Sequence, residues 1–77
     1  MLSELLPQAY AYPVTIVPDK HEAYVARIPD FPTVFTNGDT PQAALDNAYR
    51  AIALALDWYR THGAEPPAPS AALDQAA

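Results

Sequence analysis

The segment TPQAALDNAYRAIALALDWYRTHG, residues 40–63, is the longest part of the sequence with a single periodicity. Its start is marked by Thr40, whose hydroxyl suits an N-cap, and by Pro41, whose missing N–H is harmless at the first helical position. Its end is marked by Gly63, a residue type common just beyond helix C-termini. The sequence therefore predicts one helix from about Pro41 to His62.

Apolar residues within this segment recur at the spacing of one helix face. The apolar stripe consists of Ala44, Leu45, Ala48, Ala51, Ile52, Ala55, Leu56 and Tyr59. The opposite face carries Gln42, Asp46, Arg50, Asp57, Arg60 and Thr61. Because alanines alternate with larger residues in the stripe, the helix backbone can lie close to a sheet while the larger side chains fill the gaps.

Three short segments before this helix have the β-branched and aromatic composition of strands. They are residues Tyr12–Val17, Tyr24–Ile28 and Val34–Thr36. The return through residues 18–23 is too short for a parallel crossover, so the first two segments are expected to form an antiparallel hairpin. The predicted fold class is α+β: an antiparallel three-stranded meander, with at most a short fourth strand, covered on one face by one helix.

Two connections in this scheme have a specific backbone chemistry. Pro29-Asp30-Phe31-Pro32 places two prolines around an acid and an aromatic residue, which predicts a rigid turn. Asn37-Gly38-Asp39 is expected to turn the chain into the helix, with Gly38 free to take a positive φ.

A single helix cannot cover both faces of the predicted sheet. Alternation directs Tyr24, Ala26 and Ile28 to one face and Val25 to the other, and apolar residues of the other strands also fall on both faces. An uncovered apolar face in a small protein usually belongs to an interface. We therefore expect a homodimer or a higher even oligomer.

The chain is expected to divide into three parts. Residues 1–9 have enough leucine for one turn but not for a lasting helix, which predicts a loose N-terminal arm. Residues 10–63 form the β-β-β-α domain. Residues 64–77 are rich in proline and alanine and are expected to form an extended, largely unpacked tail.

Composition excludes several classes of protein. The 77 residues allow one domain, and the absence of cysteine excludes disulfides, thiolate metal sites and cysteine nucleophiles. The sequence has no export leader and no apolar run long enough to span a bilayer, so we expect a cytoplasmic protein. The net charge is −5, and the four basic residues are scattered, which argues against nucleic-acid binding. An acidic surface suits a basic protein partner, or serves only to keep a small protein in solution.

Residues 24–45, YVARIPDFPTVFTNGDTPQAAL, resemble the HicB-type antitoxins of bacterial toxin–antitoxin pairs. The matching pieces occur in order: Tyr24-Val25-Ala26, Pro29-Asp30-Phe31-Pro32, Gly38-Asp39-Thr40, Ala44-Leu45 and Asn47-Ala48, preceded by Tyr12-Pro13-Val14. The resemblance covers about residues 12–60. It implies a partial ribonuclease-H-like domain that binds and masks a HicA-type toxin, a small basic RNA-cleaving protein.

The sequence departs from that family pattern in three places. Ala43 stands where an acid often completes a capping box, and Thr33 stands where glycine is usual. Many members continue into a fourth strand and a DNA-binding domain, whereas this sequence stops at Ala77. We therefore expect no sequence-specific DNA binding by this chain alone.

A ribonuclease-H-like fold raises the question of two-metal nuclease chemistry, which needs several converging carboxylates. The candidates are Glu22, Asp30, Asp39 and Asp46. Asp46 lies on the solvated helix face, Asp39 fits the helix cap and Glu22 fits the hairpin end, so only Asp30 lies in a constrained loop. We therefore expect no enzymatic activity, no catalytic residues, no metal and no cofactor.

The expected partner-binding residues are Asp30 and Phe31 in the rigid loop, with Glu22 and Asp39 as outer charges that speed association. Tyr49, Leu54 and Trp58 flank the helix stripe, and either sheet-edge packing or an interface explains them. Two functions follow: an antitoxin that neutralises a small basic HicA-like toxin, or a stand-alone structural or regulatory module that self-associates or binds another protein or a small ligand.

Overall fold

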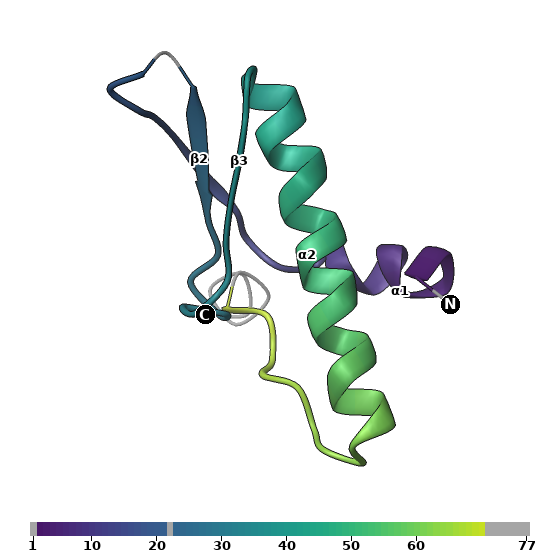
Figure 1. The fold of residues 1–77 in the computed structure, drawn as a ribbon. Helices are drawn as coiled ribbons and strands as arrows, with labels where there is room; N and C mark the ends of the chain where they lie inside the picture. The colour runs from purple at the N-terminus through teal and green to yellow at the C-terminus, as the bar shows by residue number, and fades with distance from the viewer. Residues whose placement is uncertain (1, 22, 71–77) are drawn as a thin grey trace.

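The computed structural model describes residues 2–21 and 23–70. Along the chain its elements are α1 (Leu2–Ala9), β1 (Thr15–Pro18), β2 (Tyr24–Arg27), β3 (Phe35–Gly38) and α2 (Pro41–Thr61). The strands form one antiparallel sheet in the order β1-β2-β3, and α2 covers one of its faces (Figure 1). The predicted α+β fold class is confirmed.

Helix α2 begins and ends as its sequence indicates. Thr40 has extended backbone angles, φ −132° and ψ 160°, and its Oγ1 accepts a hydrogen bond from the Ala43 N–H at 3.0 Å. Pro41 occupies the first turn, and the helix ends at Thr61 with His62 as its C-cap. Gly63 follows with a φ of 62°, a left-handed value that favours glycine.

The sheet register aligns one residue from each strand at either end of the sheet. Thr15, Arg27 and Phe35 lie side by side at the end next to the β2–β3 loop, and Pro18, Tyr24 and Gly38 lie at the other end. Strand β1 begins three residues later than predicted, and β3 ends two residues later. The buried Tyr12 side chain packs in the core instead of lying in the strand.

The core lies between the sheet and α2. Ala26 and Ile28, at alternate positions of the second strand segment, are 0% and 2% exposed and face the helix. Ile52 is fully buried at the centre of α2. The other buried apolar residues are Leu5, Ala9, Tyr12, Phe31, Ala44, Ala48, Ala53 and Leu56.

Gly38 is required for a reason other than the predicted one. Its φ is not positive, since Gly63 is the positive-φ glycine of the described residues. A Cβ added to Gly38 would instead lie 2.7 Å from the Ala43 carbonyl carbon and 2.9 Å from the Ala43 Cβ, and it would also collide with the Ala44 nitrogen. The absent side chain therefore lets β3 pass directly under the first turn of α2.

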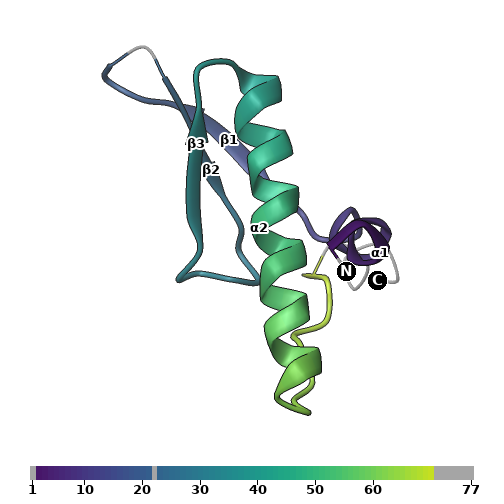
Figure 2. The same ribbon diagram turned by 45° about the vertical axis from the view of Figure 1, so that its right-hand side comes forward.

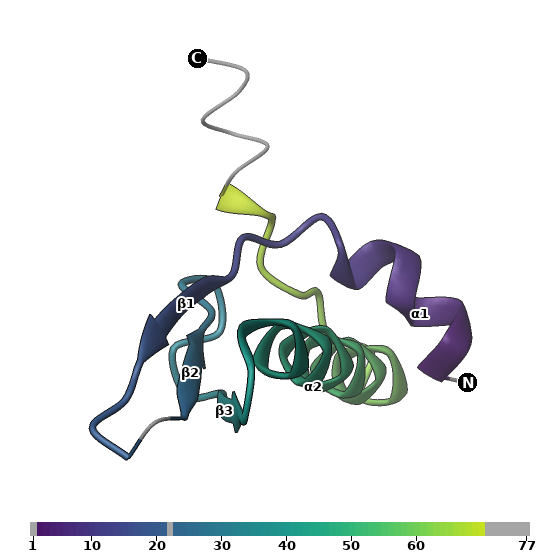
Figure 3. The same cartoon turned by 90° about the horizontal axis from the view of Figure 1, so that it is seen from above.

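The expectation of a loose N-terminal arm is wrong for residues 2–9. They form α1, which packs against α2 on the side away from the sheet (Figure 3). Leu5 is 6% exposed and Ala9 is fully buried, while the Tyr10 and Tyr49 rings meet edge to face with centroids 4.8 Å apart. A helix this short is unstable in isolation, so its contact with α2 stabilises it.

The expectation of a largely unpacked tail is wrong for residues 66–70. After α2 the chain turns back toward the β2–β3 loop (Figure 1). The Tyr12 hydroxyl donates to the Pro67 carbonyl at 2.6 Å, and Ser70 donates to Asp30 Oδ2 from its backbone N–H (3.1 Å) and its Oγ (3.2 Å). No fourth strand occurs within residues 2–21 and 23–70, and residues 71–77 of the predicted tail lie outside the described part.

Replacing Tyr12 with phenylalanine tests the tail contact. Burial, together with the charge of Asp30 and the neighbouring Tyr59, raises the pKa of Tyr12 above 10.0. Folding therefore favours the protonated phenol. The stability that the phenol contributes is present below pH 10 and is lost as the pH rises through its folded-state pKa. We expect Tyr12→Phe to cost about 1 kcal/mol at neutral pH through the lost hydrogen bond.

The matched measurement is urea unfolding of both proteins at pH 7 and above pH 10. The stability difference between them should shrink at the higher pH. A difference that stays constant would show that ionisation of Tyr12 is not coupled to folding.

Candidate functional site

The loop between β2 and β3 contains two consecutive turns. The Phe31 N–H donates to the Ile28 carbonyl at 2.9 Å, and the Val34 N–H donates to the Phe31 carbonyl at 2.9 Å. The Phe31 side chain is 5% exposed and packs against the rings of Tyr12 (centroids 5.0 Å apart) and Tyr59 (6.4 Å). Phe31 therefore anchors the loop to the core and has little surface exposed in this conformation. Its predicted contact with a partner stays a prediction.

Asp30 is the half-buried acid at the tip of this anchored loop. Ser70 occupies its Oδ2 atom through two hydrogen bonds. The loop is thus held from the core side by Phe31 and from the tail side by Ser70. A loop fixed in this way presents its outer surface to a partner with little loss of conformational freedom on binding.

The acids predicted to bind a partner do not converge. Asp39 is exposed in the turn after β3, whereas Asp30 precedes β3, so the length of that strand, roughly 10 Å, separates them. Glu22 lies outside the described residues. Within residues 2–21 and 23–70, no three histidine or acidic side chains are grouped as a metal ion would require.

The sheet face opposite α2 is a second candidate site. Its positions alternate with the buried ones of the core, and they are Thr15, Val17, Val25, Arg27, Phe35 and Asn37. Phe35 is 71% exposed, the most exposed large apolar residue in the described part of the chain. The structure thus contains the partly apolar open face that the alternation of the strands predicted. Phe35 itself was not singled out, although its position in the alternation identifies it.

Phe35 lines two hollows of the surface. The first has a volume of about 320 Å³ and is lined by Thr15, Arg27, Ile28, Pro29, Pro32, Val34 and Phe35. The second has a volume of about 380 Å³ and is lined by Val25, Phe35, Thr36 and Asn37. Phe35 is therefore the residue that the two hollows share.

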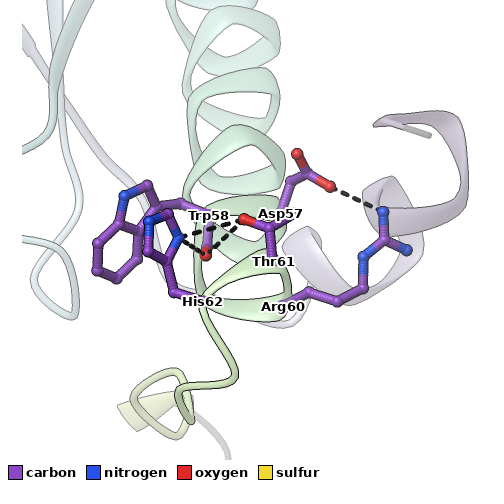
Figure 4. A network of polar contacts seen from close by, with 5 residues as sticks. All are labelled: Asp57, Trp58, Arg60, Thr61 and His62. Carbon is purple, nitrogen blue, oxygen red and sulfur yellow. Dashed lines mark hydrogen bonds and ion pairs between the residues drawn. The ribbon is translucent and has the colours of Figure 1, made fainter.

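The C-terminal end of α2 carries a network of polar and aromatic contacts (Figure 4). The His62 imidazole stacks on the Trp58 indole with centroids 4.1 Å apart, and its Nδ1 lies 2.8 Å from the Trp58 carbonyl oxygen. Thr61 Oγ1 donates to the same carbonyl at 3.0 Å, and Arg60 pairs with Asp57 at 2.7 Å. The Trp58 carbonyl also accepts the His62 backbone N–H at 3.1 Å, so the polar contacts of this helix end gather on one carbonyl oxygen.

The three residues that flank the helix stripe separate into two groups. Tyr49 is half-buried and packs against Tyr10, so it belongs to the α1–α2 contact. Leu54 and Trp58 are 56% and 53% exposed, and neither packs on the sheet. Viewed from the side in Figure 2, the end of α2 that carries Trp58 extends beyond the sheet.

No helix in the described residues is both long and apolar enough to cross a membrane. A search of solved structures gives no significant match.

The sequence has clear relatives. It is 36% identical over 58 residues to "Antitoxin HicB 1" of Photorhabdus laumondii, an alignment that covers 75% of this chain and 37% of that protein. Residues 12–77 match the family described as "HicB_like antitoxin of bacterial toxin-antitoxin system". This match includes all three strands, the anchored loop and α2, and the chain therefore belongs to the HicB-like antitoxin family.

Proposed function

We propose that this protein is an antitoxin that binds and neutralises a small basic HicA-like RNA-cleaving toxin in the cytoplasm. The observation that carries the proposal is the family match over residues 12–77. The net charge of −5 supports it, because an acidic protein attracts a basic one and accelerates their encounter. The chain spans only 37% of the length of the related antitoxin, so the activity of that whole protein enters here as part of the proposal.

The proposed mechanism is steric masking without catalysis. Asp30 is the first contact residue, since the loop that carries it is already fixed by Phe31 and Ser70. Asp39 and Glu22 act as outer charges that raise the association rate more than the lifetime of the complex. The scattered basic residues support the further proposal that this chain alone does not bind DNA sequence-specifically.

A stand-alone module remains the second candidate function. The open sheet face with its exposed Phe35 favours it, because such a face supports self-association without a toxin. The discriminating observation is the genetic neighbourhood. If an adjacent reading frame encodes a small basic protein that this chain binds and inactivates, the antitoxin function is supported. If the chain rescues growth from no neighbouring small basic protein, the stand-alone module is supported.

Replacing Asp30 with alanine tests the contact residue. We expect Asp30→Ala to weaken binding of the neighbouring basic protein by about tenfold or more, mainly through faster dissociation, because a buried charged contact governs the dissociation rate. Surface plasmon resonance gives both rates, and growth rescue measures neutralisation.

Two further variants separate the roles of these groups. Ser70→Ala removes one donor to Asp30 but keeps its carboxylate, so toxin binding should persist. Asp39→Asn should slow association and leave dissociation nearly unchanged. If Asp30→Ala binds and neutralises the toxin as well as the unmodified protein, the loop is not the contact site.

A further inference from the structure

The C-terminal end of α2 carries a tryptophan that lies outside both the core and the proposed contact loop. Trp58 is the single tryptophan of the chain, and it is 53% exposed. The His62 imidazole lies nearly parallel to its indole, with an interplanar angle of 20° and centroids 4.1 Å apart. This stack covers one face of the indole and restrains its orientation. An exposed aromatic side chain that is already held in place is well suited to anchor an interface.

Trp58 lies in the same region of the molecule as the β2–β3 loop. The Tyr59 ring meets the Trp58 indole edge to face with centroids 5.2 Å apart, and it also contacts the Phe31 ring, with centroids 6.4 Å apart. The indole therefore lies no further from the Phe31 ring than these two separations together, and Phe31 directly follows Asp30 in the sequence. An interface patch of about 800 Å² on one partner is wide enough to include both the loop and the indole.

The arginines of α2 lie away from the Trp58 side of the helix. Arg60 pairs with Asp57 at 2.7 Å, and Figure 4 shows this pair on one side of α2 and the Trp58 and His62 rings on the other. Arg50 lines a hollow between α1 and α2. The face of an indole is electron-rich and attracts a guanidinium or ammonium group. The Trp58 side of α2 can therefore accept a cation from a partner.

We propose that Trp58 is an aromatic anchor for the basic partner, and that an arginine or lysine of that partner stacks on its indole. This inference rests on the proposed antitoxin function and adds a contact to it. Asp30 offers one carboxylate, and Ser70 already donates two hydrogen bonds to its Oδ2. A neighbouring indole supplies the apolar area that a single carboxylate lacks, and tryptophan is among the residues that contribute most to binding at interfaces.

Leu54 provides a control within the same helix. It lies one turn before Trp58 and is 56% exposed, so the two side chains are equally accessible. A partner that only covered apolar surface would need both residues to the same extent. A partner cation needs the indole, because an aliphatic side chain has no π face.

The first test measures the affinity for the neighbouring small basic protein by surface plasmon resonance. Trp58→Ala and Trp58→Leu should each raise the Kd about tenfold or more, since leucine restores apolar area without a π face. Trp58→Phe keeps a ring that attracts cations less strongly, so its Kd should rise only about threefold. Leu54→Ala should raise the Kd about twofold or less, as for most residues outside a hot spot. Circular dichroism should show that all four variants are folded.

The second test uses the fluorescence of the unmodified protein. Acrylamide quenching measures the exposure of Trp58 directly, because the chain has no other tryptophan. The quenching constant should fall about twofold or more when the partner binds, since the half-exposed indole becomes buried in the contact. The same measurement on the Trp58→Phe complex gives the signal of any tryptophan in the partner, which is then subtracted.

The outcomes separate this inference from the antitoxin function itself. If the partner binds and is neutralised while Trp58→Leu binds as tightly as the unmodified protein, the cation contact is wrong and the antitoxin function stands. An equal loss in Leu54→Ala, or an indole that stays equally open to acrylamide in the complex, also overturns the contact. If no neighbouring basic protein binds the unmodified chain, both proposals fail.

Discussion

Replacing Gly38 with alanine is expected to destabilise the protein by about 3 kcal/mol or more, a large share of the stability of a domain this small. The added methyl group would collide with backbone atoms of Ala43 and Ala44, which cannot rotate away as a side chain can. Strand β3 and the first turn of α2 would have to separate, and that contact closes one end of the core. Thermal and urea unfolding of Gly38→Ala measure this loss.

The second glycine of the chain is the matched control. Gly63 has a φ of 62°, and a Cβ added there would meet no atom within 4 Å. Gly63→Ala should therefore cost only about 1 kcal/mol, the strain of an alanine in the left-handed region. Equal losses in the two variants would show that the close approach of β3 to α2 does not decide the effect at Gly38.

Replacing Phe31 with alanine is expected to cost about 3–5 kcal/mol, because it removes a buried aromatic ring and leaves a cavity. Phe31 is 5% exposed and contacts the rings of Tyr12 and Tyr59. The loss would loosen the β2–β3 loop together with the core. The measurement is urea unfolding followed by circular dichroism.

Phe31→Leu is the control for this variant, since it keeps most of the apolar volume and should lose much less stability. Both variants should also be assayed for toxin neutralisation. A folded, fully stable Phe31→Ala that fails to bind toxin would contradict the structural role and support Phe31 as a contact residue.

The elements that could be predicted from sequence are those whose signals are local. Helix α2 carries its own caps in Thr40, Pro41 and Gly63, so its limits were predicted within one or two residues. Helix α1 could not be predicted, since its residues are too few to form a stable helix alone. Its stability depends on contact with α2, which is distant in the sequence.

The candidate site was predictable only in part, for a related reason. Alternation within a strand distinguishes inside from outside, which is why the open face followed from the sequence. A loop has no such period, so the sequence indicated that Asp30 and Phe31 lie in a rigid turn but not that the Phe31 ring points into the core. The contact between Ser70 and Asp30 joins residues 40 positions apart and has no local signal at all.

Two hydrogen-bonded ties join the tail to the rest of the molecule, one from Tyr12 to Pro67 and one from Ser70 to Asp30. They bear on the order in which the chain folds. They join residues 55 and 40 positions apart, and closing the longer of these loops from an unfolded chain costs roughly 3.5 kcal/mol of entropy. A hydrogen bond contributes about 1 kcal/mol, so the ties form only after the sheet and α2 have brought their ends together. By the same reasoning they open first. In hydrogen exchange the Ser70 amide should lose protection well before the amides of α2, and each such opening frees the Asp30 carboxylate without unfolding the core.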